Sequence, residues 1–150
     1  MQKLHFETLI NAPVEKVWDT MLSDATYREW TRAFAPGSHY EGSWNQGSKM
    51  LFLGPDPDSG KEMGMVSRIK ENRPYEFVSI EHLGIVQDGI EDTESPEAKK
   101  WSPAFENYTF VKQNGFTQLQ VDMDIADEYK AEFEKTWPKA LEDLKALSEK

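Results

Sequence analysis

Cysteine is absent from this 150-residue chain, which excludes disulfide bonds, thiolate catalysis and cysteine-ligated zinc or iron–sulfur centres. Basic residues are also few, because 17 Lys and Arg face 27 Asp and Glu and leave a net charge of -10. That charge repels nucleic-acid phosphates and anionic lipid headgroups. We therefore expect neither nucleic acid nor a membrane surface among the partners of this protein.

Long apolar runs and reactive motifs are missing too. No segment approaches the roughly 20 apolar residues of a membrane span, and the first residues, MQKLHFETLI, lack the basic segment and apolar run of a secretion signal. We expect a soluble, cytoplasmic protein without membrane insertion. The chain also has no Gly-rich phosphate loop and no Gly-x-Ser-x-Gly elbow, so no motif predicts nucleotide hydrolysis or esterase chemistry.

The three histidines give no metal-binding pattern. His5, His39 and His82 fall on different predicted elements without the spacing of a zinc site. Residues 56–60, DPDSG, lack the alternating oxygen ligands of a calcium loop. We predict no metal site and no cofactor.

Aromatic residues, by contrast, are plentiful for so acidic a chain, with five Trp and eight Phe. They must be gathered in a core or around a pocket. A chain of this length fits one domain, residues 1–150, and folding at this size buries roughly 70% of the surface that the unfolded chain exposes. A core with an internal pocket is therefore feasible.

The beginning of the chain predicts a strand followed by two short helices. Residues 3–11 alternate in polarity as a half-buried strand does. Pro13 suits the first turn of a helix, and Ser23 or Asp24 caps a second helix. The predicted inward faces are Leu4, Phe6, Thr8 and Ile10 on the strand, Val14, Val17, Trp18, Met21 and Leu22 on the first helix, and Tyr27 and Trp30 on the second.

Turn residues divide residues 38–124 into strands. Glycines and the pair Arg73-Pro74 punctuate this region, and short turns between successive strands favour an antiparallel meander. One acidic segment, residues 84–103, is longer than a meander needs, so it is either a flap over one end of the sheet or a solvated loop without a role. The predicted strands are 39–44, 48–53, 62–71, 75–83, 104–112 and 116–125.

The pair Asn114-Gly115 predicts a two-residue hairpin turn, which fixes the register of its two strands. One face of the hairpin is then apolar, whereas the other is mostly polar and meets water. The predicted pairs are Gln113 with Phe116, Phe110 with Leu119, Tyr108 with Val121 and Glu106 with Met123. The apolar face carries Tyr108, Phe110, Leu119, Val121 and Met123, and the polar face carries Thr109, Val111, Gln118, Gln120 and Asp122.

The last segment, from about Asp127 to the end, predicts an amphipathic helix with Asp127 as its cap. Pro138 lies inside it and removes one backbone hydrogen bond, so we expect a kink there. A helix with a wide aromatic face needs the apolar face of a sheet to lie against. The helix face carries Tyr129, Phe133, Trp137, Leu141, Leu144 and Leu147.

This order of elements resembles the SRPBCC superfamily of START-related, helix-grip proteins. The segments INAPVEKVWDTMLSDATYREW and TWPKALEDLKAL are similar to its branch named after the heat-shock-protein ATPase activator homologues. The resemblance implies an α+β fold in which a seven-stranded curved antiparallel sheet wraps around the long C-terminal helix, with a cavity between them. Some relatives bind apolar ligands, some are cyclases or aromatases, and a eukaryotic branch stimulates a chaperone's ATPase, so the fold alone does not fix the function.

Glu106 and His82 are the candidate acid–base groups. Glu106 shares the inner face of the hairpin with Tyr108, where a carboxylate could act as a general base or hold a ligand's hydroxyl. If strands 75–83 and 104–112 are neighbours, as the resemblance implies, His82 approaches Glu106. The simpler interpretations, which we favour, leave Glu106 at the wet end of its strand and make His82 a hydrogen-bonded group of the cavity wall. We therefore assign no catalytic residue, and an enzyme is the less favoured outcome.

We predict that the protein binds a small apolar molecule, aromatic or lipid-like, between the sheet and the terminal helix. Methionines on the strands would let such a cavity adapt to its ligand. The alternatives are a cyclase- or dehydratase-type enzyme that uses the cavity's acid–base groups, and a regulatory protein that interacts with a chaperone. The predicted ligand-binding residues are Trp30, Met50, Phe52, Met63, Met65, Ile80, His82, Glu106, Tyr108, Phe110, Leu119, Val121, Met123, Phe133, Trp137 and Leu141.

Overall fold

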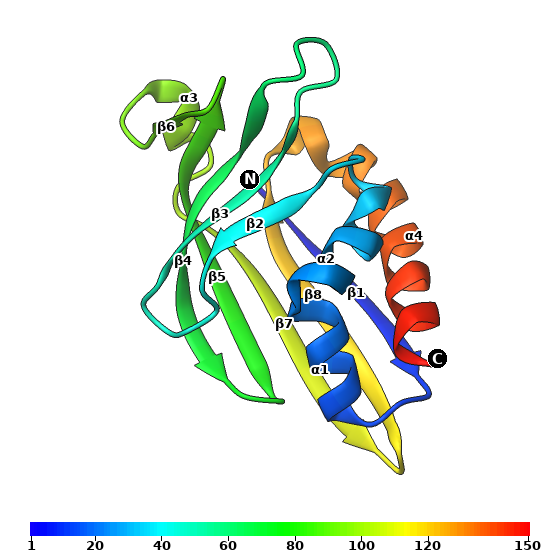
Figure 1. Ribbon diagram of the computed structural model, residues 1–150. Helices are drawn as coiled ribbons and strands as arrows, with labels where there is room; N and C mark the ends of the chain where they lie inside the picture. The colour runs from blue at the N-terminus through cyan, green and yellow to red at the C-terminus, as the bar shows by residue number, and fades with distance from the viewer.

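The computed structural model describes residues 1–150, which fold around one curved antiparallel sheet (Figure 1). Seven strands form the path β1-β8-β7-β5-β4-β3-β2, which is the expected number, and a short additional strand, β6, pairs with β5. The strands are β1 Gln2–Ile10, β2 His39–Gly42, β3 Lys49–Pro55, β4 Glu62–Arg73, β5 Phe77–Gln87, β6 Ile90–Asp92, β7 Ala104–Gln113 and β8 Phe116–Ile125.

Three helices lie on one face of this sheet (Figure 1). The long helix α4 contacts β1, and the short helices α1 and α2 lie beside α4. The architecture is therefore the α+β helix-grip arrangement that the resemblance implied. The helices are α1 Val14–Leu22, α2 Asp24–Trp30, α3 Pro96–Lys99 and α4 Lys130–Ser148, with 3-10 turns η1 Thr31–Ala33 and η2 Asp127–Tyr129.

The β7–β8 hairpin has the predicted register, and all four predicted pairs occur. Asn114 and Gly115 have φ angles of 51° and 87°, the left-handed values that a type I′ turn requires. Asn and Gly adopt such angles at little cost, so local turn chemistry is sufficient to set the register of this hairpin.

Some helix ends differ from the prediction. Pro13 stands just before α1, and no side chain caps α2 at Ser23. Asp127 does not cap the terminal helix but begins η2, so α4 starts at Lys130. Because a 3-10 turn winds more tightly than an α-helix, Tyr129 leaves the apolar stripe of α4 and is exposed.

The segment 84–103 is not one long loop. β5 continues to Gln87, β6 pairs back onto β5, and α3 follows with Ser95 as its cap. The Asp92 carboxylate accepts the backbone N–H groups of Glu94 and Ser95, each at 3.0 Å, which fixes the turn between β6 and α3. These elements are too short to produce a periodic sequence pattern, which is why the sequence predicted a loop.

A buried apolar cluster fills the space between the helices and the sheet, and two buried hydrogen bonds join its parts. The Trp30 indole N–H donates to the Met21 carbonyl oxygen at 3.0 Å, which ties α2 to α1. The Thr117 hydroxyl donates to the Ala12 carbonyl oxygen at 2.8 Å, which ties the turn before α1 to β8. Buried polar groups of this kind stabilise a fold only when paired, so both bonds help to position the helices.

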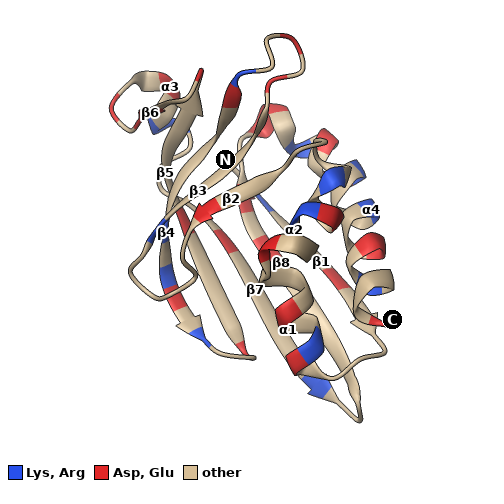
Figure 2. Cartoon of the chain, viewed as in Figure 1, with Lys and Arg blue, Asp and Glu red and all other residues tan.

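Both acidic and basic side chains lie along α1 and α4 (Figure 2). On α4, Lys139 pairs with Asp143 and Lys145 with Glu149, each four residues apart and at 2.7 Å. None of the helices is both long and apolar enough to cross a membrane.

Candidate ligand-binding site

A cavity of about 430 Å³ opens between the sheet, the segment from α2 to β2, and the N-terminal half of α4. Its volume falls within the roughly 300–1,000 Å³ of small-molecule pockets. Aromatic and methionine side chains make up much of its wall. The aromatic members are Tyr27, Trp30, Phe34, Phe52, Trp101, Tyr108, Phe133 and Trp137, and the methionines are Met63, Met65 and Met123.

A chain of hydrogen bonds across three neighbouring strands supplies polar groups of the cavity wall. His82 on β5 contacts Glu106 on β7, with 3.1 Å between Nε2 and Oε1. On the other side of the ring, His82 Nδ1 lies 2.7 Å from the Oγ of Ser67 on β4. The Tyr108 hydroxyl donates to the second carboxylate oxygen, Glu106 Oε2. The approach of His82 to Glu106, which was expected if the two strands are neighbours as the resemblance implies, is therefore present.

Strand pairing explains why these residues meet. Ile80 on β5 pairs with Glu106 on β7, and His82 lies two residues along β5 on the same face. Between β4 and β5 the register shifts by one residue at a β-bulge, because Val66 pairs with Gly84 while the next residue, Ser67, pairs with His82, which leaves the extra residue on β5. The bulge is thus the local feature that brings a third polar side chain to this face.

All three hydrogen bonds are satisfied when His82 is neutral and Glu106 is ionised. His82 then donates its Nε2–H to Glu106 and accepts the Ser67 hydroxyl proton at Nδ1. The carboxylate accepts from both His82 and Tyr108. The favoured interpretation that Glu106 meets solvent at a wet strand end is wrong, because its side chain is only 17% exposed and bonded within the wall.

Ser67, His82 and Glu106 follow one another as the residues of a hydrolase triad do, but Ser67 has no access to a ligand. It is fully buried, and the cavity wall does not include it. A nucleophile has to reach the reacting atom, so this arrangement does not support acyl transfer. His82 and Glu106 do line the cavity, where they can orient a ligand or exchange a proton with it.

Tyr27 and Tyr108 keep their hydroxyl protons in this environment. Burial is the main cause that raises the pKa of both side chains above the ordinary value near 10, and the negative charge of Glu106 raises it further. Tyr108 therefore remains a hydrogen-bond donor to Glu106 across the physiological pH range.

Most of the predicted ligand-binding residues line this cavity, whereas six do not. The residues on its wall are Trp30, Phe52, Met63, Met65, His82, Glu106, Tyr108, Met123, Phe133 and Trp137. The other six, Met50, Ile80, Phe110, Leu119, Val121 and Leu141, are buried in the core cluster instead. Helix α1 contacts β7 and β8 and fills the space over part of the sheet. The period of a strand shows which face is inward but not where along it a helix closes the space.

Other parts of the wall come from residues that the sequence did not indicate. Trp101 reaches the cavity from the segment after α3 and lies 5.2 Å from Tyr129, between ring centres. The segment between α2 and β2 carries several more, for which no sequence pattern predicted an inward position. The wall residues outside the predicted ligand-binding set are Tyr27, which was predicted only to face inward, and Thr31, Phe34, Ala35, Ser38, Leu53, Gly54, Pro55, Pro57, Trp101, Asp124, Ile125 and Glu132.

Trp137 joins the aromatic part of the wall to the core. Its ring centre lies 5.1 Å from that of Phe34, 5.9 Å from that of Trp30 and 6.1 Å from that of Phe6. The side chain is buried, and its indole N–H has no hydrogen-bond partner. Trp137 is therefore held by apolar packing and not by a hydrogen bond of its indole, and its fluorescence reports on the cavity that it lines.

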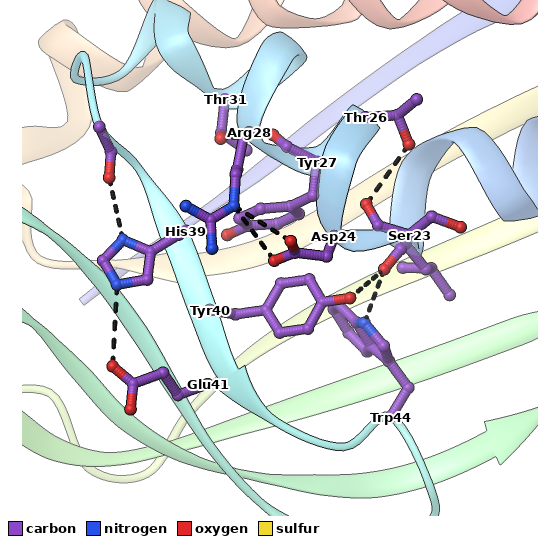
Figure 3. Close-up of polar contacts among 12 residues, drawn as sticks. Ser23, Asp24, Thr26, Tyr27, Arg28, Thr31, His39, Tyr40, Glu41 and Trp44 are labelled. Carbon is purple, nitrogen blue, oxygen red and sulfur yellow. Dashed lines mark hydrogen bonds and ion pairs between the residues drawn. The ribbon is translucent and has the colours of Figure 1, made fainter.

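Two side chains fasten the corner between α1 and α2 to the β2 region (Figure 3). Tyr40 and Trp44 donate from Oη and Nε1 to the Leu22 carbonyl oxygen at 2.6 and 2.9 Å. Leu22 ends α1, where carbonyl groups lack partners within the helix. The ring of Tyr27 lies 5.0 Å from that of Tyr40, between centres, so this anchor also positions the wall that α2 contributes.

His39, Glu41 and Glu62 could hold a metal ion outside the cavity, since their ligand atoms lie within 4.8 Å of one another. His39 Nε2 is 3.8 Å from Glu41, and its Nδ1 lies 2.9 Å from the Gly37 carbonyl oxygen (Figure 3). The same Nε2 is 3.6 Å from Glu62. The carboxylate side chains are 59% and 49% exposed, so water solvates them without an ion. No sequence spacing indicates this group, because β3 separates β2 from β4 in the sheet.

Comparison with models of protein families identifies the family of this chain. Residues 11–149 match the family model described as Activator of Hsp90 ATPase homolog 1-like protein. The chain belongs to this family. The Activator of Hsp90 ATPase homolog 1-like family is the branch whose resemblance the sequence showed. Comparison with curated protein sequences finds no match.

Solved structures share the fold at low sequence identity. Protein MLL2253 from Mesorhizobium loti is 14% identical, with a TM-score of 0.72 over 97% of this chain and 96% of its own. An Activator of Hsp90 ATPase homolog 1-like protein from Aeromonas hydrophila is 14% identical, with a TM-score of 0.71 over 97% and 91%. Protein CV1439 from Chromobacterium violaceum is 18% identical, with a TM-score of 0.69 over 100% and 99%. Similarity at this level establishes the fold, and the function has to be argued from the site.

Proposed function

We propose that this protein binds a small, largely apolar molecule, with an aromatic or lipid-like body, in the cavity between the sheet and α4. The observation that carries the proposal is a cavity of about 430 Å³ walled by aromatic and methionine side chains, with the hydrogen-bonded pair His82 and Glu106 on the same wall. Apolar burial would supply most of the affinity, at about 25 cal/mol per Å². The polar pair would orient the ligand.

A test uses an uncharged apolar dye, N-phenylnaphthylamine, whose emission rises in an apolar site. We expect saturable binding to the wild-type protein and a change in Trp fluorescence, because Trp30, Trp101 and Trp137 line the cavity. Extraction of the purified protein, followed by mass spectrometry, would identify molecules that co-purify with it.

A cavity-filling variant provides the control. Ala35 lines the cavity, so Ala35→Trp should abolish dye binding, whereas Ala146→Trp, on the exposed side of α4, should leave it unchanged. Phe133→Ala should weaken binding by removing an aromatic wall residue. Equal dye binding by Ala35→Trp and the wild type would place the dye outside the cavity and contradict the proposal.

An acid–base enzyme of the cyclase or dehydratase type is the second candidate. It is favoured by one observation, the 3.1 Å contact between His82 Nε2 and Glu106 Oε1 on the cavity wall. A pair of this kind can shuttle a proton to a bound substrate. The enzyme predicts turnover that Glu106→Gln abolishes while the fold and ligand affinity survive, whereas simple binding predicts no turnover of any extracted ligand.

A chaperone-directed role comes from the family's description, which names an activator of the Hsp90 ATPase. Such a role would depend on the surface of the protein and not on its cavity. It predicts that Ala35→Trp leaves stimulation of a chaperone ATPase unchanged, while charge reversals on the outer sides of α1 and α4 reduce it.

A further inference from the structure

The charges around the cavity all have one sign. Three carboxylates line it, from Glu106, Asp124 and Glu132, and the wall contains no lysine or arginine. Asp124 is compensated from outside the cavity, because Lys3 Nζ lies 2.6 Å from one of its oxygens. Glu106 has no lysine or arginine partner, and its hydrogen bonds come from Tyr108 and from His82, which donates to it as a neutral ring in the arrangement described above. A negative charge therefore remains on the wall.

The first turn of α4 does not reverse this charge. A helix N-terminus favours an anion, and α4 begins at Lys130, close to the cavity residue Phe133. Glu132 already supplies a carboxylate in that turn. A ligand entering beside α4 thus meets a negative side chain before it meets the aromatic wall.

Aromatic rings add a second preference for positive charge. Ring faces attract cations because their π-electrons carry partial negative charge, and Trp is the strongest of them. Three Trp side chains line this cavity, Trp30, Trp101 and Trp137, together with two Tyr and three Phe. Two independent features of the wall therefore favour the same kind of ligand.

We infer that the molecule bound in this cavity is an amine with an apolar aromatic or alkyl body, held by its ammonium group at Glu106 and by its body against the aromatic wall. This inference rests on the proposed function and names its ligand class. It also excludes fatty acids and other apolar carboxylates, because they would place a second negative charge beside Glu106.

The hydrogen bonding of Glu106 has room for such a group. A carboxylate offers about four acceptor sites, and here one bond from His82 reaches Oε1 and one from Tyr108 reaches Oε2. An ammonium group brings three donors and can use the remaining sites. A hydroxyl group brings one donor, so an alcohol fits the same place without a charge of its own.

Three ligands that share the same apolar body and differ only in their polar group test this inference: phenylbutylamine, phenylbutanol and phenylbutanoate. We expect affinities, measured by calorimetry at neutral pH and one ionic strength, to fall in that order. The amine should bind about tenfold more tightly than the alcohol, which is the usual difference between charged and neutral hydrogen bonds. The acid should bind on the order of 100-fold more weakly than the alcohol, because like charges in a poorly solvated site cost several kcal/mol.

A matched pair of variants tests whether Glu106 causes the selectivity. Glu106→Gln and Glu134→Gln remove the same charge, but Glu134 lies on the exposed side of α4 and does not line the cavity. Glu106→Gln should reduce the preference for the amine over the alcohol to about threefold or less, while Glu134→Gln keeps it. Circular dichroism confirms folding, and the wild-type ligand series stands even if Glu106→Gln does not fold.

The outcomes separate the inference from the proposed function. If the alcohol binds and the amine binds no more tightly than the acid, the inference is wrong and the proposed function stands. An unchanged amine preference in folded Glu106→Gln also overturns it. If neither the three ligands nor the uncharged dye binds, the proposed function fails and the inference fails with it.

Discussion

Replacing Tyr108 by Phe removes one hydrogen bond from the buried network and leaves the aromatic ring in place. In the native protein the Tyr108 hydroxyl donates to Glu106, and the tyrosine is 2% exposed. The variant leaves Glu106 with His82 as its donor, so a carboxylate that is 17% exposed loses half of its hydrogen bonds. The change thus isolates the contribution of one charge-assisted bond.

The expected cost is about 1.5–3 kcal/mol, the usual contribution of a hydrogen bond to a charged group. Burial is not greatly altered, because the ring stays and only an oxygen atom is lost. For a chain of this size each kcal/mol lowers the melting temperature by roughly 2–4 °C. The variant should therefore melt roughly 3–12 °C below the wild type.

Urea denaturation of the wild type, Tyr108→Phe and Tyr75→Phe measures this cost. Tyr75 is 43% exposed, so its hydroxyl meets water and its replacement should change stability by less than about 0.5 kcal/mol. If Tyr108→Phe cost no more than Tyr75→Phe, the hydroxyl would not bond to an ionised Glu106. Tyr108 would then contribute no charge-assisted hydrogen bond to the buried network, which contradicts this prediction.

Alkaline pH offers a second measurement on the same variant. Because burial raises the pKa of folded Tyr108 above its value in the unfolded chain, the unfolded chain loses the proton first as pH rises. The stabilisation is therefore complete below about pH 10 and is lost above it. The stability of Tyr108→Phe should fall less steeply above pH 10 than that of the wild type.

Three further predictions concern the scaffold. Thr117→Val removes a buried hydroxyl that donates to a carbonyl oxygen at 2.8 Å, and should cost about 1–3 kcal/mol in urea denaturation, whereas a neutral result would mean that water replaces the bond. Gly115→Ala should cost about 1 kcal/mol, because the residue has a φ of 87° in the hairpin turn, and no loss would show that the turn rearranges. Hydrogen bonds that the His5 ring donates to the carboxylates of Glu7 and then Asp122 raise the pKa of His5. Protonated His5 therefore stabilises the fold below its unfolded pKa near 6.5, and this contribution disappears as pH rises through the folded pKa. His5→Gln should therefore be less stable than the wild type at pH 5.5, by less than about 1 kcal/mol because the site is exposed, and equally stable above pH 8. A stability difference that grew with pH would contradict this sign.

Local rules were sufficient where neighbours along the chain decide the structure. Asn114-Gly115 set a turn whose register could be counted outward, and all four predicted pairs occur. The same rules failed at the terminal helix, where a 3-10 turn replaced the expected Asp127 cap. At a helix end the free-energy difference between a 3-10 turn and an α-helical turn is small, so contacts with distant segments decide which of the two forms.

In the candidate site, too, local patterns predicted some features and distant contacts decided the others. Period-two patterning and the hairpin register placed Glu106 and Tyr108 on the inner face, and the family resemblance added His82 as a neighbour. The bulge that places Ser67 opposite His82 has no sequence signature of its own. Trp101 reaches the cavity from an acidic segment whose short elements leave no periodic pattern. The sequence pattern therefore shows which residues share the inner face, but only the tertiary structure shows which of them lie in the core and which line the cavity.

By itself the sequence determined which residue types and motifs are missing, which faces of the strands and helices are apolar, the register of one hairpin, and the resemblance to the family. These properties depend on composition and on contacts a few residues apart. Only the tertiary structure decided where α1 closes the space over the sheet and where the space stays open beside α4, so that Leu119 became core and Met123 became cavity wall. The reason is physical: the position of a void depends on how far side chains from distant segments reach, and no local period encodes that distance.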